Sequence, residues 1–315
     1  MYLLKQFLKS LGLNRTSLVN FWFRVNCAFP FRFLHVWAAR PSLIPIWFRN
    51  KLAGRTIVCF PEYPAKVGYE IAKLSMVLGF KLRPEANQPD LGLTWQDVTV
   101  REFSLPKTAR YFLNHNCKDI GKDRVEVVFE AVFGYPLRID PLTYRGLAVR
   151  KSTLNGKHDG SVIQCPIEKI EPDNVYQRLV NNQFNDNQSL DLRTPVYRGQ
   201  IPVIYKKLRP IKTRFGNDND SVTLASPDGI YTAEERAAIA RFCKAFGLDY
   251  GGLDIMRDKD DGRIYIVDVN YTPYGPPVEL SSWDRAHAIA RLATLFQKNY
   301  VDDFPSLLRE NIVAP

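Results

Sequence analysis

Long uncharged hydrophobic segments are absent from this sequence of 315 residues. No run approaches the roughly 20 apolar residues that a helix needs to cross a bilayer, and Arg15 and Arg24 interrupt any signal-peptide core. The five cysteines are scattered without zinc-binding spacing, which favours reduced thiols in a cytosolic protein. The sequence also lacks a GxGxxG motif and a Ser-His-Asp order, so a dinucleotide-binding role and a serine-hydrolase role have no support.

Acidic residues are missing from the first part of the chain, where the earliest is Glu62. Residues 1–55 contain nine Lys and Arg residues, whereas the net charge of the whole chain is +10, so the rest of the chain is close to neutral. A nucleic-acid-binding protein would more often spread its basic residues over the main domain. We therefore expect no nucleic-acid partner.

The basic N-terminal segment is rich in aromatic residues, and its first residues have helical apolar spacing (Leu3, Leu4, Phe7, Leu8 and Leu11). Basic residues interleaved with aromatic ones suit the surface of an anionic membrane. They also suit packing on the body of the protein or across a homodimer interface. Residues 1–55 thus leave both interpretations open, and we expect a cytoplasmic protein, either free or peripheral on the inner membrane face.

A hairpin with oxygen-bearing side chains is predicted between Gly251 and Pro277. Two apolar runs flank a polar DKDDG turn, a pattern typical of antiparallel strands. Asp268 and Asn270 are two apart on the second strand and project to the same side, where pairing can bring Asp254 of the first strand. An isolated Asp-x-Asn is often only a turn or cap, but an ionised Asp268 within an apolar strand needs a cation or donors. The hairpin therefore predicts a magnesium site.

This stretch resembles the C-terminal metal-binding hairpin of the ATP-grasp superfamily, which includes D-alanine–D-alanine ligase and the glutathione synthetase and RimK-type ligases. In that family an acidic residue on one strand, and an acidic residue and Asn two apart on the next, hold Mg²⁺. Asp254, Asp268 and Asn270 match in order and spacing. The resemblance implies ATP and two Mg²⁺ ions as cofactors, with Mn²⁺ as a possible substitute.

Two lysines match the phosphate-binding positions of that family. Lys122 opens an expected helix, and Lys151 ends an expected strand before a small-residue loop, residues 152–160. A lysine followed by a flexible glycine loop can place a point charge and backbone N–H groups on phosphates. Ser152, Gly156 and Gly160 are the loop residues that we expect to contact the nucleotide. Lys157 and His158 lie in the same loop, but we expect them to be exposed charged residues rather than phosphate contacts.

The resemblance further implies an adenine-binding linker and a set of arginines. Residues 174–181 resemble the linker strand between the two ATP-grasp subdomains, with Gln177 for the adenine edge, Leu179 for packing on the base and Asn181 for the ribose. Where many relatives have Glu at the polar positions, this sequence has Gln and Asn. The candidates for stabilising transition-state charge follow the D-x-R…R…R-x-N pattern of RimK-like ligases: Arg193, Arg209 and Arg214. For each of these arginines, the alternative interpretation is a surface charge without a catalytic role.

The predicted fold class is α/β (α+β): an ATP-grasp fold of two α+β subdomains, preceded by a small Rossmann-like α/β unit and a basic, aromatic helical extension. The α/β unit is indicated by a β-α-β order with a parallel sheet, and we expect it to form one wall of the acceptor-substrate cleft. The expected segments are 1–55 for the extension, 56–118 for the α/β unit, 119–300 for the ATP-grasp region (subdomains of about 119–176 and 177–300) and 301–315 for a C-terminal tail.

The activity implied by the resemblance is an ADP-forming carboxylate–amine ligase that makes an amide through an acylphosphate. The substrates are then a small carboxylate and an amine, and the basic N-terminus suggests an amino sugar or glycan precursor decorated with an amino acid at the membrane surface. Two alternatives stay open: an ATP-grasp kinase that phosphorylates a hydroxyl, and a membrane-associated scaffold protein with a decayed ATP site.

Overall fold

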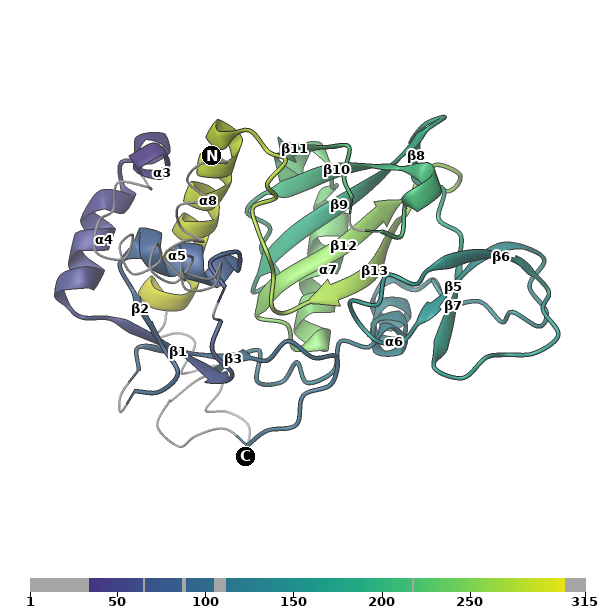
Figure 1. Cartoon of the computed structure of the whole chain (residues 1–315), viewed down its shortest axis with the longest axis horizontal. Helices are drawn as coiled ribbons and strands as arrows, with labels where there is room; N and C mark the ends of the chain where they lie inside the picture. Colours follow the sequence, from purple (N-terminus) through teal and green to yellow (C-terminus); the bar gives the residue numbers. More distant parts are fainter. Residues whose placement is uncertain (1–33, 65, 87–88, 105–111, 217, 304–315) are drawn as a thin grey trace, which may run out of the picture.

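The computed structural model describes residues 34–64, 66–86, 89–104, 112–216 and 218–303. The expected first helix, most of the aromatic N-terminal segment, Asn217 of the arginine pattern and most of the C-terminal tail lie outside these residues. Figure 1 shows three bodies side by side: a helical and parallel-sheet unit, a large antiparallel sheet and a small three-stranded sheet.

The N-terminal unit is a parallel sheet with helices on it, as the sequence predicts. Its strand order is β2-β1-β3-β4. Gly79 ends α5 with φ of +79°, and a Cβ there would lie 2.5 Å from the Trp47 carbonyl oxygen, so the tight passage between α4 and α5 requires glycine. The elements are α3 (Leu34–Ala39), α4 (Leu43–Leu52), β1 (Thr56–Pro61), α5 (Glu70–Leu78), β2 (Lys81–Arg83), β3 (Leu91–Trp95) and β4 (Phe112–Leu113).

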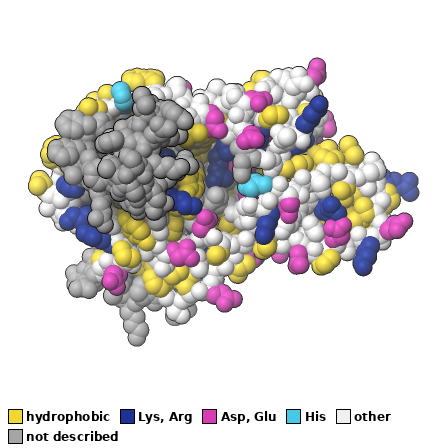
Figure 2. All heavy atoms as spheres, in the orientation of Figure 1, with side chains coloured by type: hydrophobic (Ala, Val, Ile, Leu, Met, Phe, Trp, Pro, Cys, Tyr) yellow, Lys and Arg dark blue, Asp and Glu magenta, His cyan; other side chains and the backbone are white. Residues whose placement is uncertain are grey.

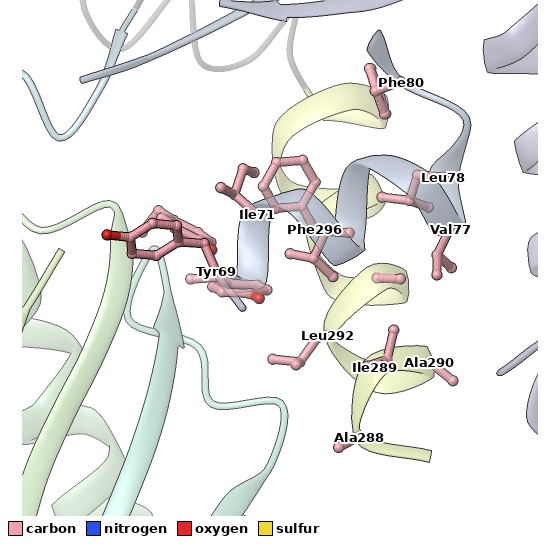
Figure 3. Close-up of a cluster of buried hydrophobic side chains, with 14 of the residues drawn as sticks. Tyr69, Ile71, Val77, Leu78, Phe80, Ala288, Ile289, Ala290, Leu292 and Phe296 are labelled. Carbon is pink, nitrogen blue, oxygen red and sulfur yellow. The ribbon is translucent and has the colours of Figure 1, made fainter. Parts of the chain in front are cut away.

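Helix α8 (Ser282–Gln297) returns from the C-terminal part of the chain to pack on α3, α4 and α5. Ile71 of α5 and Leu292 and Phe296 of α8 are fully buried in one hydrophobic cluster (Figure 3). The same cluster includes Tyr197 and Tyr250 of the large sheet. The N-terminal unit and the large sheet therefore share a core, which fixes one against the other. A π-helical turn, Lys298–Asp302, extends α8.

The large sheet is antiparallel, with the order β11-β10-β9-β12-β13 and the short β8 paired with β9. Helix α7 lies behind it in Figure 1, and its buried residues Ile239 and Phe242 share a core with the sheet. It begins with a capping box, in which the side chains of Thr232 and Glu235 accept hydrogen bonds from each other's backbone N–H. The elements are β8 (Gln183–Asn185), β9 (Gln188–Tyr197), β10 (Ile204–Pro210), β11 (Ser221–Ala225), α7 (Ala233–Phe246), β12 (Tyr250–Arg257) and β13 (Ile264–Asn270), with 3₁₀ turns at Ile211–Thr213 and Pro227–Gly229.

The third body is a small antiparallel sheet of order β6-β5-β7, preceded along the chain by α6. Helix α6 also packs on α7 and β13, so it joins this sheet to the large one. The predicted linker strand is the edge strand β7, paired with β5 from Ala148 to Ser152. The elements are α6 (Lys122–Phe133), β5 (Gly146–Ser152), β6 (Ser161–Cys165) and β7 (Asn174–Arg178).

Candidate active site

A row of charged side chains crosses the centre of the large sheet. Arg193 on β9 lies opposite Asp254 on β12, and Asp254 lies opposite Asp268 on β13. Residues that are directly opposite in neighbouring strands share a face of the sheet, so the three side chains stand side by side. Asn270 lies two residues beyond Asp268, opposite Gly252. The predicted hairpin therefore brings its three oxygen-bearing residues to one face.

Arg193 and the two carboxylates are electrostatically linked. Nη1 of Arg193 is 3.1 Å from Oδ1 of Asp254. Burial opposes ionisation of Asp254, but the positive charge of Arg193, followed by that of Lys207, holds the pKa of this carboxyl below its usual range. Burial and the neighbouring charge of Asp254 raise the pKa of Asp268. Asp254 is thus ionised, whereas ionised Asp268 needs a further cation.

The residues present fit a divalent cation. Oδ1 of Asp268 is buried and has no hydrogen-bond donor among the described residues. Oδ1 of Asp254 also lacks a donor in hydrogen-bond geometry there, despite its ion pair. Oδ1 of Asn270 accepts from the backbone N–H of Thr272 at 2.7 Å, which fixes the carboxamide at the strand end. Within the described parts of the chain no three His, Cys, Asp or Glu side chains form a metal cluster, so a cation here would rely on two carboxylates, the carboxamide and phosphate oxygens, as Mg²⁺ commonly does.

The two predicted phosphate lysines lie near this row. Nζ of Lys151 donates to the carbonyl of Val267 at 3.1 Å. A β-bulge shifts the β12–β13 register next to Asp254, so Val267 has no partner residue on β12. Burial lowers the pKa of Lys151 to about 8, although the negative charge of Asp268 acts to raise it. Lys122 begins α6, and its Nζ donates to the carbonyl of Leu154 in the glycine loop at 2.5 Å.

A buried carboxyl that was not identified from the sequence joins helix α6 to the linker strand. Glu126 lies one helical turn after Lys122 on α6, and its Oε1 accepts a hydrogen bond from Nε2 of Gln177 at 2.7 Å. Burial raises the pKa of Glu126 to about 7. Glu126 follows Lys122 by four residues, within an apolar stretch of helix. This spacing was a sequence signal that the two side chains share one face of α6. Gln177 is thus oriented by Glu126, and its role toward adenine stays a prediction.

The other predicted nucleotide contacts lie around the β5–β6 loop and after β7. The backbone N–H of Ser152 donates to Asp159 at 3.1 Å, which closes the base of the loop. Gly156 has φ of +72° with open space around it, whereas a Cβ at Gly160 would clash with the ring of Phe215. The nucleotide contacts of these three residues, and that of the half-buried Leu179, stay predictions.

Asn181 is held by the turn between β12 and β13. Its Nδ2 donates to Asp260 at 2.7 Å, and its carbonyl accepts from the backbone of Lys259. Its contact with the ribose stays a prediction.

Arg209 lies on β10 and Arg214 follows the 3₁₀ turn after β10, and each has its own partners. Nε of Arg209 is 3.1 Å from Oδ2 of the buried Asp191. Nη2 of Arg214 donates to Oδ1 of Asn182 at 2.5 Å. Of the three predicted arginines, the structure thus brings only Arg193 into the row with Asp254.

Lys207, which the sequence analysis also missed, lies between Arg193 and Arg209 on this face. It is half-buried, and burial lowers its pKa. Among the described residues its ammonium has no hydrogen bond or ion pair. Its two-residue spacing from Arg209 on a strand was a sequence signal for a shared face. Figure 2 shows Lys and Arg side chains in the floor of a hollow over this part of the sheet.

The loop after Asn270 is held by the first turn of α5. The backbone N–H of Glu70 donates to the carbonyl of Pro273 at 2.9 Å, and Nζ of Lys73 donates to the carbonyl of Gly275 at 2.6 Å. The Glu70 carboxyl is buried and accepts from the hydroxyl of Tyr197 on β9 at 2.6 Å. The N-terminal unit therefore forms a wall beside the row of charged side chains, where the acceptor substrate is expected from the sequence.

Comparison with known proteins identifies the fold. The ATP-grasp ligase PsnB, solved with a minimal precursor, Mg and ADP, matches 77% of this chain and 98% of its own at a TM-score of 0.51 and 12% sequence identity. The chain has the ATP-grasp fold. The predicted fold class is thereby confirmed.

Two further ATP-grasp structures are similar to this chain. A second PsnB structure, with a phosphomimetic precursor variant, aligns over 62% of this chain and 62% of that chain, which is less than two thirds of its length, at a TM-score of 0.42 and 16% identity. D-alanine–D-alanine ligase from Bacillus anthracis complexed with ATP aligns over 81% of this chain and 98% of that chain, at a TM-score of 0.45 and 13% sequence identity. No protein-family model and no curated protein matches the sequence. Because the sequence identities are this low, the structural similarity shows the ATP-grasp fold alone.

Proposed function

We propose that this protein is an ATP-dependent ligase that joins a carboxylate to an amine through an acylphosphate. The observation that carries the proposal is the row of Arg193, Asp254 and Asp268 on one face of the sheet, with Lys151 beside it. Two carboxylates and a carboxamide suit Mg²⁺ that is shared with phosphates, and lysine ammonium groups suit the phosphates themselves. The ATP-grasp fold supports the same chemistry.

Each residue then has a defined task. Lys122 and Lys151 would bind the nucleotide phosphates, and Asp254, Asp268 and Asn270 would hold Mg²⁺, which supplies charge neutralisation at the β- and γ-phosphates when bound. The substrate carboxylate attacks the γ-phosphorus, and ADP leaves. The amine then attacks the acyl carbon, and phosphate leaves with formation of the amide. Arg193 would stabilise the negative charge on the oxygen of the tetrahedral intermediate.

The acceptor is proposed to bind between the row and the N-terminal unit. The loop 271–277 follows directly after Asn270 and is fixed to α5 by Glu70 and Lys73. PsnB was solved with precursor peptides, so peptides belong among the compounds to test, beside the amino acids and amino sugars that the sequence suggests. Arg209 and Arg214, which have other partners, are proposed to shape the site rather than to contact the reacting atoms.

The test is phosphate release from Mg-ATP with pools of carboxylic acids, amino acids, amino sugars and short peptides. We expect release to require one carboxylate and one amine, and to fall by at least about a hundredfold in Asp268→Ala because a ligand of the shared cation is lost. The matched control is Asp228→Ala, since the side chain of Asp228 is 80% exposed and forms an ion pair with Arg236. Release with a hydroxyl compound alone would instead identify a kinase, and failure to bind ATP would support the scaffold alternative.

A further inference from the structure

Helix α4 is firmly attached to the molecule along one face. Leu43 and Asn50 are fully buried. Nδ2 of Asn50 donates to the carbonyl of Leu78 at 2.8 Å and to Oε1 of Gln297 at 3.0 Å, so one side chain joins α4 to both α5 and α8. Nε1 of Trp47 donates to the carbonyl of Met76 at 3.1 Å. The orientation of α4 is therefore fixed, and so is the face that it turns outward.

The outward face of α4 carries an apolar stripe. Ile44, Phe48 and Leu52 are 37%, 53% and 85% exposed. A spacing of four residues places all three on one side of the helix. Leu34 on the adjacent α3 is also more than half exposed. Single exposed apolar residues are ordinary, but a stripe along a fixed helix indicates an interaction surface.

Basic residues flank this stripe, and acidic ones are absent from this part of the sequence. Residues 34–61 contain Arg40, Arg49, Lys51 and Arg55 and no Asp or Glu. Arg49 pairs with Asp302 and Arg55 with Asp90 across the fold. Arg40 and Lys51 have no acidic partner among the described residues. The outward side of α4 therefore presents positive charge without an acidic partner, beside exposed apolar side chains.

We propose that this surface, defined by Ile44, Phe48 and Leu52 with Arg40 and Lys51, docks on the headgroup region of an anionic lipid bilayer. Apolar side chains with Lys and Arg at their margins are the arrangement by which a helix lies in a membrane interface: the apolar groups enter the acyl boundary, and the cations meet lipid phosphates. The proposal does not depend on the ligase activity. None of the described helices is long and apolar enough to cross a membrane, so the contact is with the surface of the bilayer.

The position of α4 keeps the catalytic face free in this arrangement. Helices α3 and α4 form one end of the molecule, and the β5–β7 sheet forms the opposite end (Figure 1). Figure 2 shows Lys and Arg side chains together with hydrophobic ones at the α4 end, apart from the hollow over the large sheet. A bilayer at the α4 end therefore leaves the hollow accessible, including to an acceptor that is itself anchored in the bilayer.

The test is co-sedimentation of the full-length protein with vesicles of phosphatidylcholine alone and of an equimolar mixture with phosphatidylserine. We expect binding to the mixed vesicles that weakens between about 0.1 M and 1 M salt, where the screening length falls from about 10 Å to 3 Å. Phe48→Ser with Leu52→Ser should lower the partition coefficient at least about tenfold, because two apolar side chains no longer enter the bilayer. Arg40→Glu with Lys51→Glu should lower binding to the mixed vesicles only.

The matched control is Val127→Ser, which removes an exposed apolar residue from the outer side of another helix and should bind as the wild type does. Circular dichroism and the thermal midpoint of each variant check that the fold is intact. The proposal is overturned if the Phe48/Leu52 variant binds as tightly as the wild type, or if vesicle charge has no effect. It is also overturned if the variant converts a dimer to a monomer while no protein binds vesicles, since α4 would then contact a second copy.

Discussion

A lysine binds phosphate through its charge, and Lys151 lies where that charge is weakened. Burial lowers its pKa to about 8. A group that must be protonated to bind loses affinity as the pH rises through its pKa. We therefore expect the dissociation constant of Mg-ATP to rise above about pH 8, by up to about tenfold per pH unit. Calorimetry between about pH 7 and 9.5 measures this change.

Lys151→Arg is the matched variant, because a guanidinium stays protonated throughout this pH range. Its affinity for Mg-ATP should change little with pH, even if it is weaker overall. An equally steep loss of affinity in both proteins would contradict the role assigned to Lys151.

Single residues were predictable from the sequence where the signal was local. Asp268 and Asn270 share a face because the side chains of a strand alternate, and this holds whatever the strand pairs with. Glu126 was missed although it lies one turn from Lys122, because nothing in the sequence shows that this helix faces β7. Its partnership with Gln177 spans 51 residues. Lys207 was missed for the same reason, since its neighbours belong to other strands.

Secondary-structure elements followed their sequence signals closely, and α7 is the clearest example. Thr232 and Glu235, three residues apart, form a capping box at its start, and Gly247 ends the helix with φ of +76°. Thr232→Ala should destabilise the protein by about 1 kcal/mol, because backbone N–H groups at the start of the helix lose their acceptor. Urea denaturation measures the loss, and the affinity for ATP should not change because α7 lies behind the sheet.

The conservative variant Thr232→Ser separates capping from packing. Its hydroxyl still accepts from the N–H of Glu235, so most of the stability should return. If Thr232→Ser is as unstable as Thr232→Ala, the methyl group rather than the cap supports α7 there.

At the scale of the whole molecule, Glu70 joins the N-terminal unit to the large sheet. Burial raises the pKa of Glu70 to about 7, although its hydrogen bond from Tyr197 acts in the opposite direction. A glutamate in an unfolded chain has a pKa of about 4.3. Between these two pKa values the folded state binds more protons than the unfolded state. The contribution of Glu70 to the free energy of unfolding therefore falls as the pH rises from about 4.3 to about 7, and it is lowest above about pH 7.

Glu70→Gln should therefore flatten the fall in stability between about pH 5 and 8, because its amide does not titrate. Urea midpoints at the two ends of this range measure the slope. Glu168→Gln changes an exposed glutamate and should keep the wild-type slope, as a matched control. An unchanged slope in Glu70→Gln would mean that other groups, Glu126 among them, determine the pH dependence.

The sequence by itself determined the local chemistry of this protein: the hairpin with Asp254, Asp268 and Asn270, the lysine at the start of α6, and the lysine before the glycine loop. Strand alternation, helix caps and turn residues act over a few positions, so they can be recognised without a partner. The tertiary structure alone decided which groups meet. Arg193 lies beside Asp254 because β9 pairs with β12, α8 shares a core with α5, and Glu70 reaches Tyr197 over 127 residues. Such contacts depend on the packing of distant segments, which no local pattern in the sequence specifies.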